Sequence, residues 1–247
     1  MEALKLISVF IVGVVAAFIG TSAGGCGLIS IPALIFLGLS PQVAVATGKL
    51  GALGLIISGI YRFHKGGKID YKIGIPIALV SFVGAYFGAN TLVRIPGELL
   101  GKYVGLIVLI VLPVLFFRKD FGVKKQAKKS LPLKIIGYLL FLPLGFWGGF
   151  FGPGYAIFST YILILIFGQT FLESAGTRKV LGLGVTILSV LIFAQSGILD
   201  WFYGGALFLG MTLGSYLGAS YGIKKGNEWV RGLFVVIVAL SALKLIL

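Results

Sequence analysis

The chain has 247 residues, of which 58% are hydrophobic and only 11% are charged. A chain this apolar cannot hide its hydrophobic surface in a water-soluble core, so the composition excludes a soluble globular protein and indicates an integral membrane protein. The single cysteine, Cys26, excludes an intramolecular disulfide framework and a cysteine-based metal cluster. The net charge of +14 would suggest nucleic-acid binding in a soluble protein. Here the basic residues gather in loops, and we expect no nucleic-acid partner and no cofactor.

Ten apolar segments follow one another along the chain. A helix needs roughly 20 residues to cross a bilayer, and several of these segments are about that long. They lie near residues 4–20, 26–39, 43–61, 71–92, 99–117, 131–150, 155–168, 172–195, 200–222 and 228–247. The first segment has a charged start, as a signal peptide does, but its counterpart in the second half is internal, so we expect it to be retained. The predicted fold class is an all-α polytopic membrane protein.

The two halves of the sequence match each other when one is shifted by 130 residues. The match includes polar residues that apolar composition alone would not align, namely Thr47/Thr177, Lys49/Lys179, Asp70/Asp200 and Glu98/Glu228. We therefore expect repeat 1 over residues 1–117, a basic connector over 118–133 and repeat 2 over 134–247. A duplicated apolar chain with breaks at matching places is typical of secondary transporters whose site lies between the repeats.

The charges of the loops predict an orientation. The connector is strongly basic, with Arg118, Lys119, Lys124, Lys125, Lys128 and Lys129. Because basic loops stay in the cytoplasm, we place the connector and the 62–70 loop inside, and the 195–200 loop, which lacks Lys and Arg, outside. Besides setting the orientation, the connector could bind the anionic head groups of membrane lipids or a cytosolic partner. An odd number of crossings per half makes the repeats inverted, and re-entrant hairpins at the first two segments of each half would not change that parity.

A glycine-rich motif interrupts each half between its first two segments. Residues 20–27 read GTSAGGCG and residues 148–154 read GGFFGPG. Glycine and proline break helices, and the segments that follow have only about 14 residues, too short to span comfortably. Unwound backbone at membrane depth must line protein or a water-filled cavity, and helix N-termini facing such a cavity favour an anion. Close helix packing is the alternative reading. The candidate binding residues here are Gly24, Gly25, Cys26, Gly27, Gly152 and Gly154.

A Thr-x-Lys motif opens the third segment of each half. Lysine inside an apolar segment is costly, and snorkelling to the interface is the alternative explanation. Repetition in an inverted pair would instead bring Lys49 and Lys179 toward a common axis, with Thr47 and Thr177 as hydroxyl donors to an oxyanion. Arg178 has only Gly48 as its partner, which makes the halves unequal. Glu173 is a candidate for proton coupling, or for neutralising Lys179.

Two further patterns have structural interpretations. Glycines spaced by four residues are typical of close helix packing, either within the chain or between two copies in a homodimer. They are Gly84, Gly88, Gly210, Gly214, Gly218 and Gly222. Asp70 and Asp200 lie at loop edges, where we expect them to cap helices.

Taken together, these motifs resemble the sulfite exporter TauE/SafE family, also called the 4-toluene sulfonate uptake permease family. The resemblance rests on the glycine break running into Ile31–Leu34, on Ala44–Leu50, and on Thr177–Leu181 followed by Gly197–Trp201. It covers nearly the whole chain. It implies a multi-pass transporter in the cell membrane of a prokaryote, with a small sulfur-containing anion such as sulfite, a sulfonate or sulfoacetate as its substrate.

A membrane-embedded enzyme, an anion channel and an uptake permease are the alternatives to an exporter. The sequence offers no paired carboxylates, His/Glu metal spacing or activated serine at membrane depth, so we expect no enzyme. An anion channel could use the same lysines and helix ends as a transporter. Export of an anion can be driven by an inside-negative membrane potential, whereas an uptake permease would need coupling to protons or sodium. We favour an exporter that works by alternating access.

Overall fold

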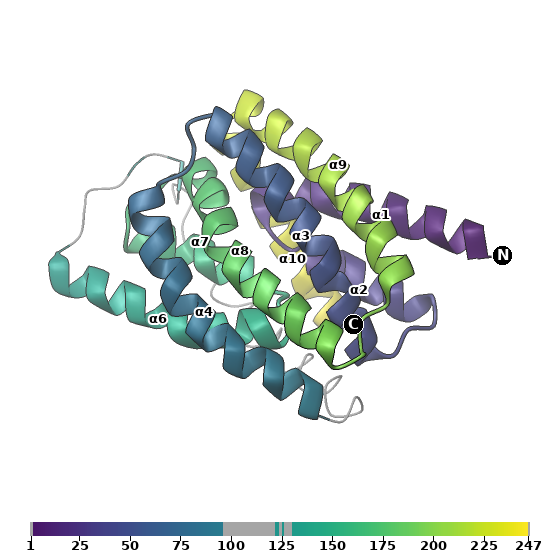
Figure 1. Cartoon of the computed structure of the whole chain (residues 1–247). Coiled ribbons are helices and arrows are strands. Elements are labelled where there is room, and N and C mark those ends of the chain that lie inside the picture. Colours follow the sequence, from purple (N-terminus) through teal and green to yellow (C-terminus); the bar gives the residue numbers. More distant parts are fainter. Residues whose placement is uncertain (1, 96–121, 124, 126–129, 247) are drawn as a thin grey trace.

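The computed structural model describes residues 2–95, 122, 123, 125 and 130–246. Over these residues the fold is all helical, as predicted (Figure 1). The helices are α1 (Glu2–Ala23), α2 (Cys26–Phe36), α3 (Pro41–Lys65), α4 (Tyr71–Arg94), α6 (Leu131–Phe150), α7 (Tyr155–Leu165), α8 (Phe171–Gln195), α9 (Trp201–Lys225) and α10 (Asn227–Ile246). The predicted segment 99–117 and most of the connector lie outside the described residues.

The helices that follow the two glycine motifs are shorter than the sequence suggested. Both α2 and α7 contain 11 residues, which is about 16 Å of helix and too short to cross a bilayer. The predicted ends at residues 39 and 168 were wrong because Gly38 and Gly168 have positive φ and stop helical geometry earlier. By contrast, α1 continues to Ala23, so the first break is confined to Gly24 and Gly25.

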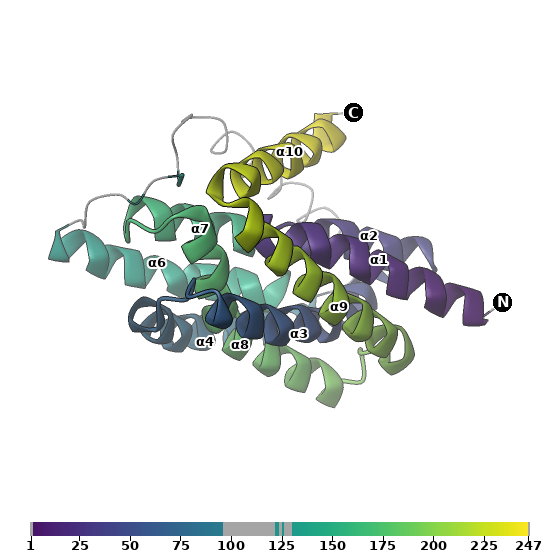
Figure 2. The same cartoon turned by 90° about the horizontal axis from the view of Figure 1, so that it is seen from above.

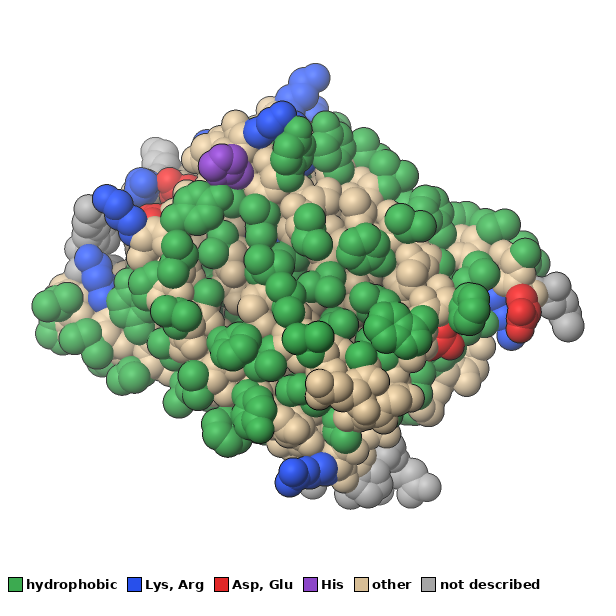
Figure 3. Space-filling model, in the orientation of Figure 1, with side chains coloured by type: hydrophobic (Ala, Val, Ile, Leu, Met, Phe, Trp, Pro, Cys, Tyr) green, Lys and Arg blue, Asp and Glu red, His purple; other side chains and the backbone are tan. Residues whose placement is uncertain are grey.

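The surface is that of a multi-pass membrane protein. Among the described residues, five helices are long and apolar enough to span a membrane, namely α1, α3, α4, α6 and α8. Their outer faces expose large apolar side chains, including Leu4, Leu79 and Leu139. Figure 3 shows apolar side chains over most of one face, with Lys and Arg gathered at its margins. This arrangement fits an apolar belt facing lipid between two polar ends.

Helices from the two halves pack against each other in an exchanged pattern. Helix α1 packs on α9 and α6 packs on α4, while α3 lies against both α9 and α8 (Figures 1 and 2). Thr47 in α3 accepts a 3.1 Å hydrogen bond from the backbone N–H of Asp200, in the loop between α8 and α9. Thr177 in α8 accepts one of the same length from Asp70, between α3 and α4. The N-terminal part of each helix therefore lies beside the loop that follows the other helix, so α3 and α8 run antiparallel.

Glycines provide the closest of these helix contacts. A Cβ atom added to Gly210, Gly214 or Gly218 of α9 would collide with a backbone carbonyl of α1. Gly84 and Gly88 of α4 lie in the same way against the backbone of α6. The prediction that these glycines are packing surfaces is confirmed, and the partners are helices of the same chain. These faces are therefore covered within the chain, and a homodimer stays a prediction.

Polar side chains begin the long helices, as predicted for the two aspartates. Asp70 accepts a 3.2 Å hydrogen bond from the N–H of Ile73 at the start of α4, and Asp200 accepts one of 2.9 Å from Tyr203 at the start of α9. These bonds satisfy helix N–H groups that have no partner inside the helix. Both aspartates thus fix the loops that α3 and α8 contact.

We predict that Gly214→Ala destabilises the protein by about 1–3 kcal/mol, because the new methyl group meets the Val14 carbonyl and α1 must shift away. Gly205→Ala, in the same helix, is the matched control. A Cβ there meets nothing within 4 Å, and alanine favours a helix by about 1 kcal/mol over glycine. Thermal unfolding in detergent compares the two variants. Equal melting temperatures would show that α1 and α9 are not in this contact.

Candidate functional site

A cavity of about 140 Å³ lies where the two chain breaks meet. Its volume can hold several water molecules or a small solute. The break residues that line it are Gly24, Gly25, Cys26 and Gly27 from repeat 1 and Gly152, Pro153 and Gly154 from repeat 2. Helices α3 and α8 complete the lining with Lys49, Arg178 and Lys179. The structure thus brings together the glycine motifs and both paired lysines, which are far apart in the sequence.

Two helix N-termini open at this cavity without a capping side chain. Gly25 precedes α2 and Gly154 precedes α7, and both adopt left-handed backbone geometry, with φ of 82° and 86°. Neither has a side chain that could accept a hydrogen bond from the first turn, and no side chain of the described residues caps these two helix starts. The first N–H groups of a helix carry partial positive charge and have no partner within the helix. Both helix starts are therefore suited to an anionic ligand.

Lys49 extends from α3 of repeat 1 to the break of repeat 2. Only 8% of its surface is exposed, so the lysine does not snorkel out of the protein. Its Nζ donates a hydrogen bond to the carbonyl oxygen of Gly148, near the C-terminal end of α6. A helix C-terminus carries partial negative charge, which stabilises a neighbouring cation.

Two cations from α8 face the same cavity. Arg178 is 5% exposed and Lys179 is 4% exposed. The Nη2 atom of Arg178 donates a 2.8 Å hydrogen bond to the carbonyl oxygen of Ser22, near the C-terminal end of α1. Arg178 therefore extends from repeat 2 to the break of repeat 1, just as Lys49 extends in the opposite direction.

No carboxylate balances these three cations within the part of the chain that the structure describes. The cavity lining contains no Asp or Glu. The one ion pair among the described residues joins Lys125 to Glu173, and neither of these residues lines the cavity. A buried cation without a partner costs several kcal/mol of solvation free energy. Carbonyl oxygens offset part of that cost, and a bound anion would offset more.

The two threonines of the Thr-x-Lys motifs lie outside the cavity lining. Thr47 and Thr177 are fully buried, and their hydroxyl oxygens accept hydrogen bonds from the backbone of Asp200 and Asp70. Thr177 also accepts a 3.2 Å hydrogen bond from the side chain of Gln169. The structure therefore gives both threonines contacts that hold loops in place, and it does not bring them to the lysines' cavity. Their predicted part in anion binding stays untested.

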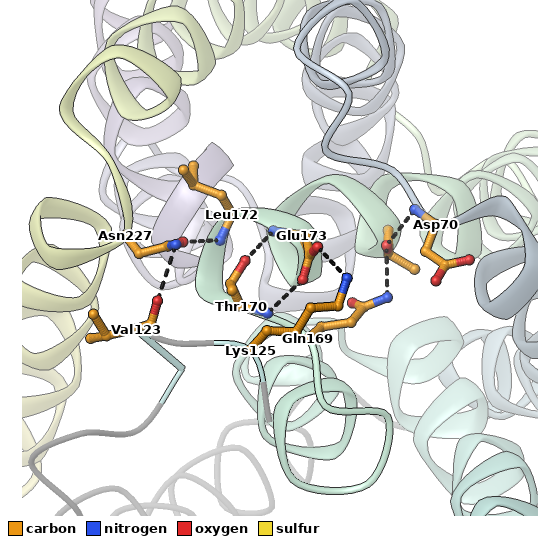
Figure 4. A network of polar contacts seen from close by, with 9 residues as sticks. Asp70, Val123, Lys125, Gln169, Thr170, Leu172, Glu173 and Asn227 are labelled. Carbon is orange, nitrogen blue, oxygen red and sulfur yellow. Dashed lines mark hydrogen bonds and ion pairs between the residues drawn. The ribbon is translucent and has the colours of Figure 1, made fainter. Parts of the chain in front are cut away.

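Glu173 belongs to a separate polar cluster at the start of α8 (Figure 4). Its carboxylate accepts a 2.9 Å hydrogen bond from the N–H of Thr170 and pairs with Lys125 at 3.0 Å. The hydrogen bond and charge of Glu173 raise the pKa of Lys125. The acid thus neutralises the connector lysine, not Lys179. A role of Glu173 in coupling stays a prediction.

Cys26 lies in the cavity wall at the start of α2. Its Sγ atom is 3.8 Å from the Sδ atom of Met211 in α9. The thiol is partly buried beside a soft apolar side chain, an environment that suits cysteine as a small hydrophobic residue.

Sequence reasoning did not identify every cation of the site. Arg178 was noted only as an asymmetry between the halves, and Gly148 only as part of a break. The available signal for Arg178 was its position next to Lys179 inside an apolar segment, where charge is costly. The carbonyl groups that bind Lys49 and Arg178 could not be identified from the sequence, because every residue has a backbone carbonyl.

Comparison with known proteins identifies the family of the chain. Residues 9–245 match the sulfite exporter TauE/SafE family. The chain belongs to this family. This is a family of membrane transporters and not of enzymes, and the relatives are described as probable membrane transporter proteins.

The similar proteins come from several bacteria. A probable membrane transporter protein of Haemophilus influenzae is 29% identical, with 96% of this chain and 92% of the relative covered. The probable membrane transporter protein YfcA of Escherichia coli is 28% identical, with 96% and 88% covered. YdhB of Bacillus subtilis, with the same description, is 25% identical, with 88% and 89% covered. No solved structure matches the chain significantly.

We predict that Thr177→Val lowers stability by about 1 kcal/mol, because the N–H of Asp70 loses its acceptor. The affinity of the folded protein for sulfite, the anion in the family's name, should not change. Thr91→Val is the control, since the Thr91 hydroxyl donates only within its own helix, to Phe87. Thermal unfolding and sulfite titration are the measurements. Weaker sulfite binding with parental stability would make Thr177 an anion ligand instead.

Proposed function

We propose that the protein is a secondary transporter that exports a small sulfur-containing anion, such as sulfite, a sulfonate or sulfoacetate, by alternating access. The observation that carries this proposal is the cavity lined by Lys49 and Lys179, into which two uncapped helix N-termini open. The family name supports a sulfur oxyanion as the substrate.

The energetics of the cavity favour an anion over a neutral or cationic solute. The lysines lie in a cavity whose described walls carry no negative charge, so an entering cation would be repelled. An oxyanion accepts charge-assisted hydrogen bonds from ammonium groups and from helix N–H groups together. Neither contact requires a particular atom at the centre of the anion, so these residues set the charge of the substrate more than its identity.

We further propose that the two repeats are related by a pseudo-two-fold axis in the membrane plane. The antiparallel course of α3 and α8 supports it, as do the two equivalent hydrogen bonds that the backbone N–H groups of Asp200 and Asp70 donate to Thr47 and Thr177. The exchanged packing of α1 on α9 and α6 on α4 supports it as well. Such a pair of inverted repeats can open its central site first to one side and then to the other.

Export is the direction that the membrane potential favours. An inside-negative potential contributes about 2.3 kcal/mol per charge per 100 mV to moving an anion outward. Within residues 2–95 and 130–246, the cavity lining has no carboxylate that could carry a coupling proton. Both points support uncoupled export.

The inverted arrangement predicts opposite exposure of two equivalent positions, Lys65 and Gln195, which are 130 residues apart and exposed. In a Cys26→Ala background, Lys65→Cys should resist a membrane-impermeant maleimide in intact cells, because the basic loop is cytoplasmic. Gln195→Cys should react with it. Each variant should react in broken cells. Equal labelling of the two cysteines in intact cells would contradict inverted repeats.

The cavity predicts that both paired lysines bind the substrate. Lys49→Met and Lys179→Met remove charge at similar length, and loss of a charge-assisted hydrogen bond should lower affinity for sulfite by roughly 10- to 150-fold. The effects should be non-additive because the lysines share one ligand. Isothermal titration of purified protein measures the affinities.

Lys72→Met is the matched control, since Lys72 is exposed at the start of α4. It should bind sulfite as the parent does. Parental affinity in both cavity variants would contradict the proposed site, and unitary currents in a planar bilayer would favour a channel over a transporter.

A further inference from the structure

Arg178 has more hydrogen-bond donors than the protein satisfies. A guanidinium carries five N–H donors, and within the described residues Arg178 makes one hydrogen bond, from Nη2 to the Ser22 carbonyl. Its Nε atom is buried and has no partner among the described residues. A buried donor without an acceptor costs about 1–3 kcal/mol, so a residue placed in this way is expected to have a further ligand.

The position of Arg178 shows where that ligand would lie. The side chain is 5% exposed and lines the cavity. A Cβ atom at Gly24 would lie 3.4 Å from its Nη1 atom, so the guanidinium lies against the first glycine break. No carboxylate lines this cavity in the described part of the chain, and arginine stays protonated in proteins. The missing acceptor is therefore to be sought in a solute inside the cavity.

The equivalent position in repeat 1 has no side chain. Gly48 also lines the cavity, and a Cβ atom there would touch only Ile31. Repeat 2 thus contributes Arg178 and Lys179 to the cavity, whereas repeat 1 contributes Lys49 alone. The site thus holds three basic side chains, two of them from α8.

We propose that Arg178 binds the substrate directly and makes the site select dianions over monoanions. The proposal rests on the proposed function, because it takes Lys49 and Lys179 as ligands of the same anion. A monoanion leaves two of the three cations uncompensated, whereas a dianion leaves one. The guanidinium fork also suits a group that presents two oxygens side by side, such as a tetrahedral or pyramidal oxyanion.

The test compares two probes that share a tetrahedral sulfur with at least three oxygens, sulfate as the dianion and methanesulfonate as the monoanion. Titration of the purified parent protein should show tighter binding of sulfate. Arg178→Gln should weaken sulfate binding by roughly 10- to 150-fold and methanesulfonate binding much less, so that the preference collapses. Because the ratio is measured on one sample, it does not depend on the folded fraction.

Two variants control this experiment. Arg178→Lys keeps the charge but loses the fork, and it should retain part of the preference for sulfate. Arg94→Gln changes an exposed arginine at the end of α4 and should leave both affinities unchanged.

The remaining outcomes separate this inference from the proposed function. A parent that binds methanesulfonate as tightly as sulfate, or an Arg178→Gln variant that keeps the preference, would overturn the role of Arg178. In either case, weak binding by Lys49→Met would still support the anion site. A parent that binds neither probe nor sulfite would contradict both proposals.

Discussion

Basic side chains buried with no carboxylate from the described residues beside them are the constraint on which the centre of this protein depends. Lys49 and Arg178 are buried, and each donates a hydrogen bond to a backbone carbonyl near the C-terminal end of a helix. Those carbonyls are accessible because the chain stops being helical just beyond them, at the two glycine breaks. The same breaks start new helices whose first turns have no capping side chain among the described residues. Broken helices therefore supply both the counter-dipoles for the cations and further donors for an anion.

The connections across the centre join the two halves in both directions. Lys49 of repeat 1 bonds to the break of repeat 2, and Arg178 of repeat 2 bonds to the break of repeat 1. In the same two helices, Thr47 lies two residues before Lys49 and Thr177 lies directly before Arg178, and both bond to loops of the opposite half. Movement of one half against the other would have to strain or exchange these contacts.

Close glycine packing determines which elements can move together. The backbone of α9 lies directly on α1, and that of α4 lies on α6, because a Cβ atom at the contact would collide with a carbonyl. Contacts this close favour the movement of each pair as a rigid unit. Each pair joins the first helix of one half to the fourth helix of the other. The cavity lies between these units and is completed by α3 and α8.

The sequence by itself determined the class of protein and the chemistry of its centre. Composition required a membrane, the 130-residue repeat paired Lys49 with Lys179, and the glycine motifs marked where helices break. These signals are local, because each depends on residue type and spacing along the chain. The sequence did not determine where α2 and α7 end, since Gly38 and Gly168 take left-handed geometry that glycine permits but does not require.

Tertiary structure decided which polar groups meet. Thr47 and Thr177 share a motif with the lysines. Side chains two residues apart in a helix point about 160° away from each other around its axis, so the threonines face loops and the lysines face the cavity. Glu173 lies on the same helix as Lys179 but pairs with the connector. The carbonyl partners of Lys49 and Arg178 could not be read from sequence, because backbone oxygens are the same in every residue. Only the packing of the two halves selects Gly148 and Ser22.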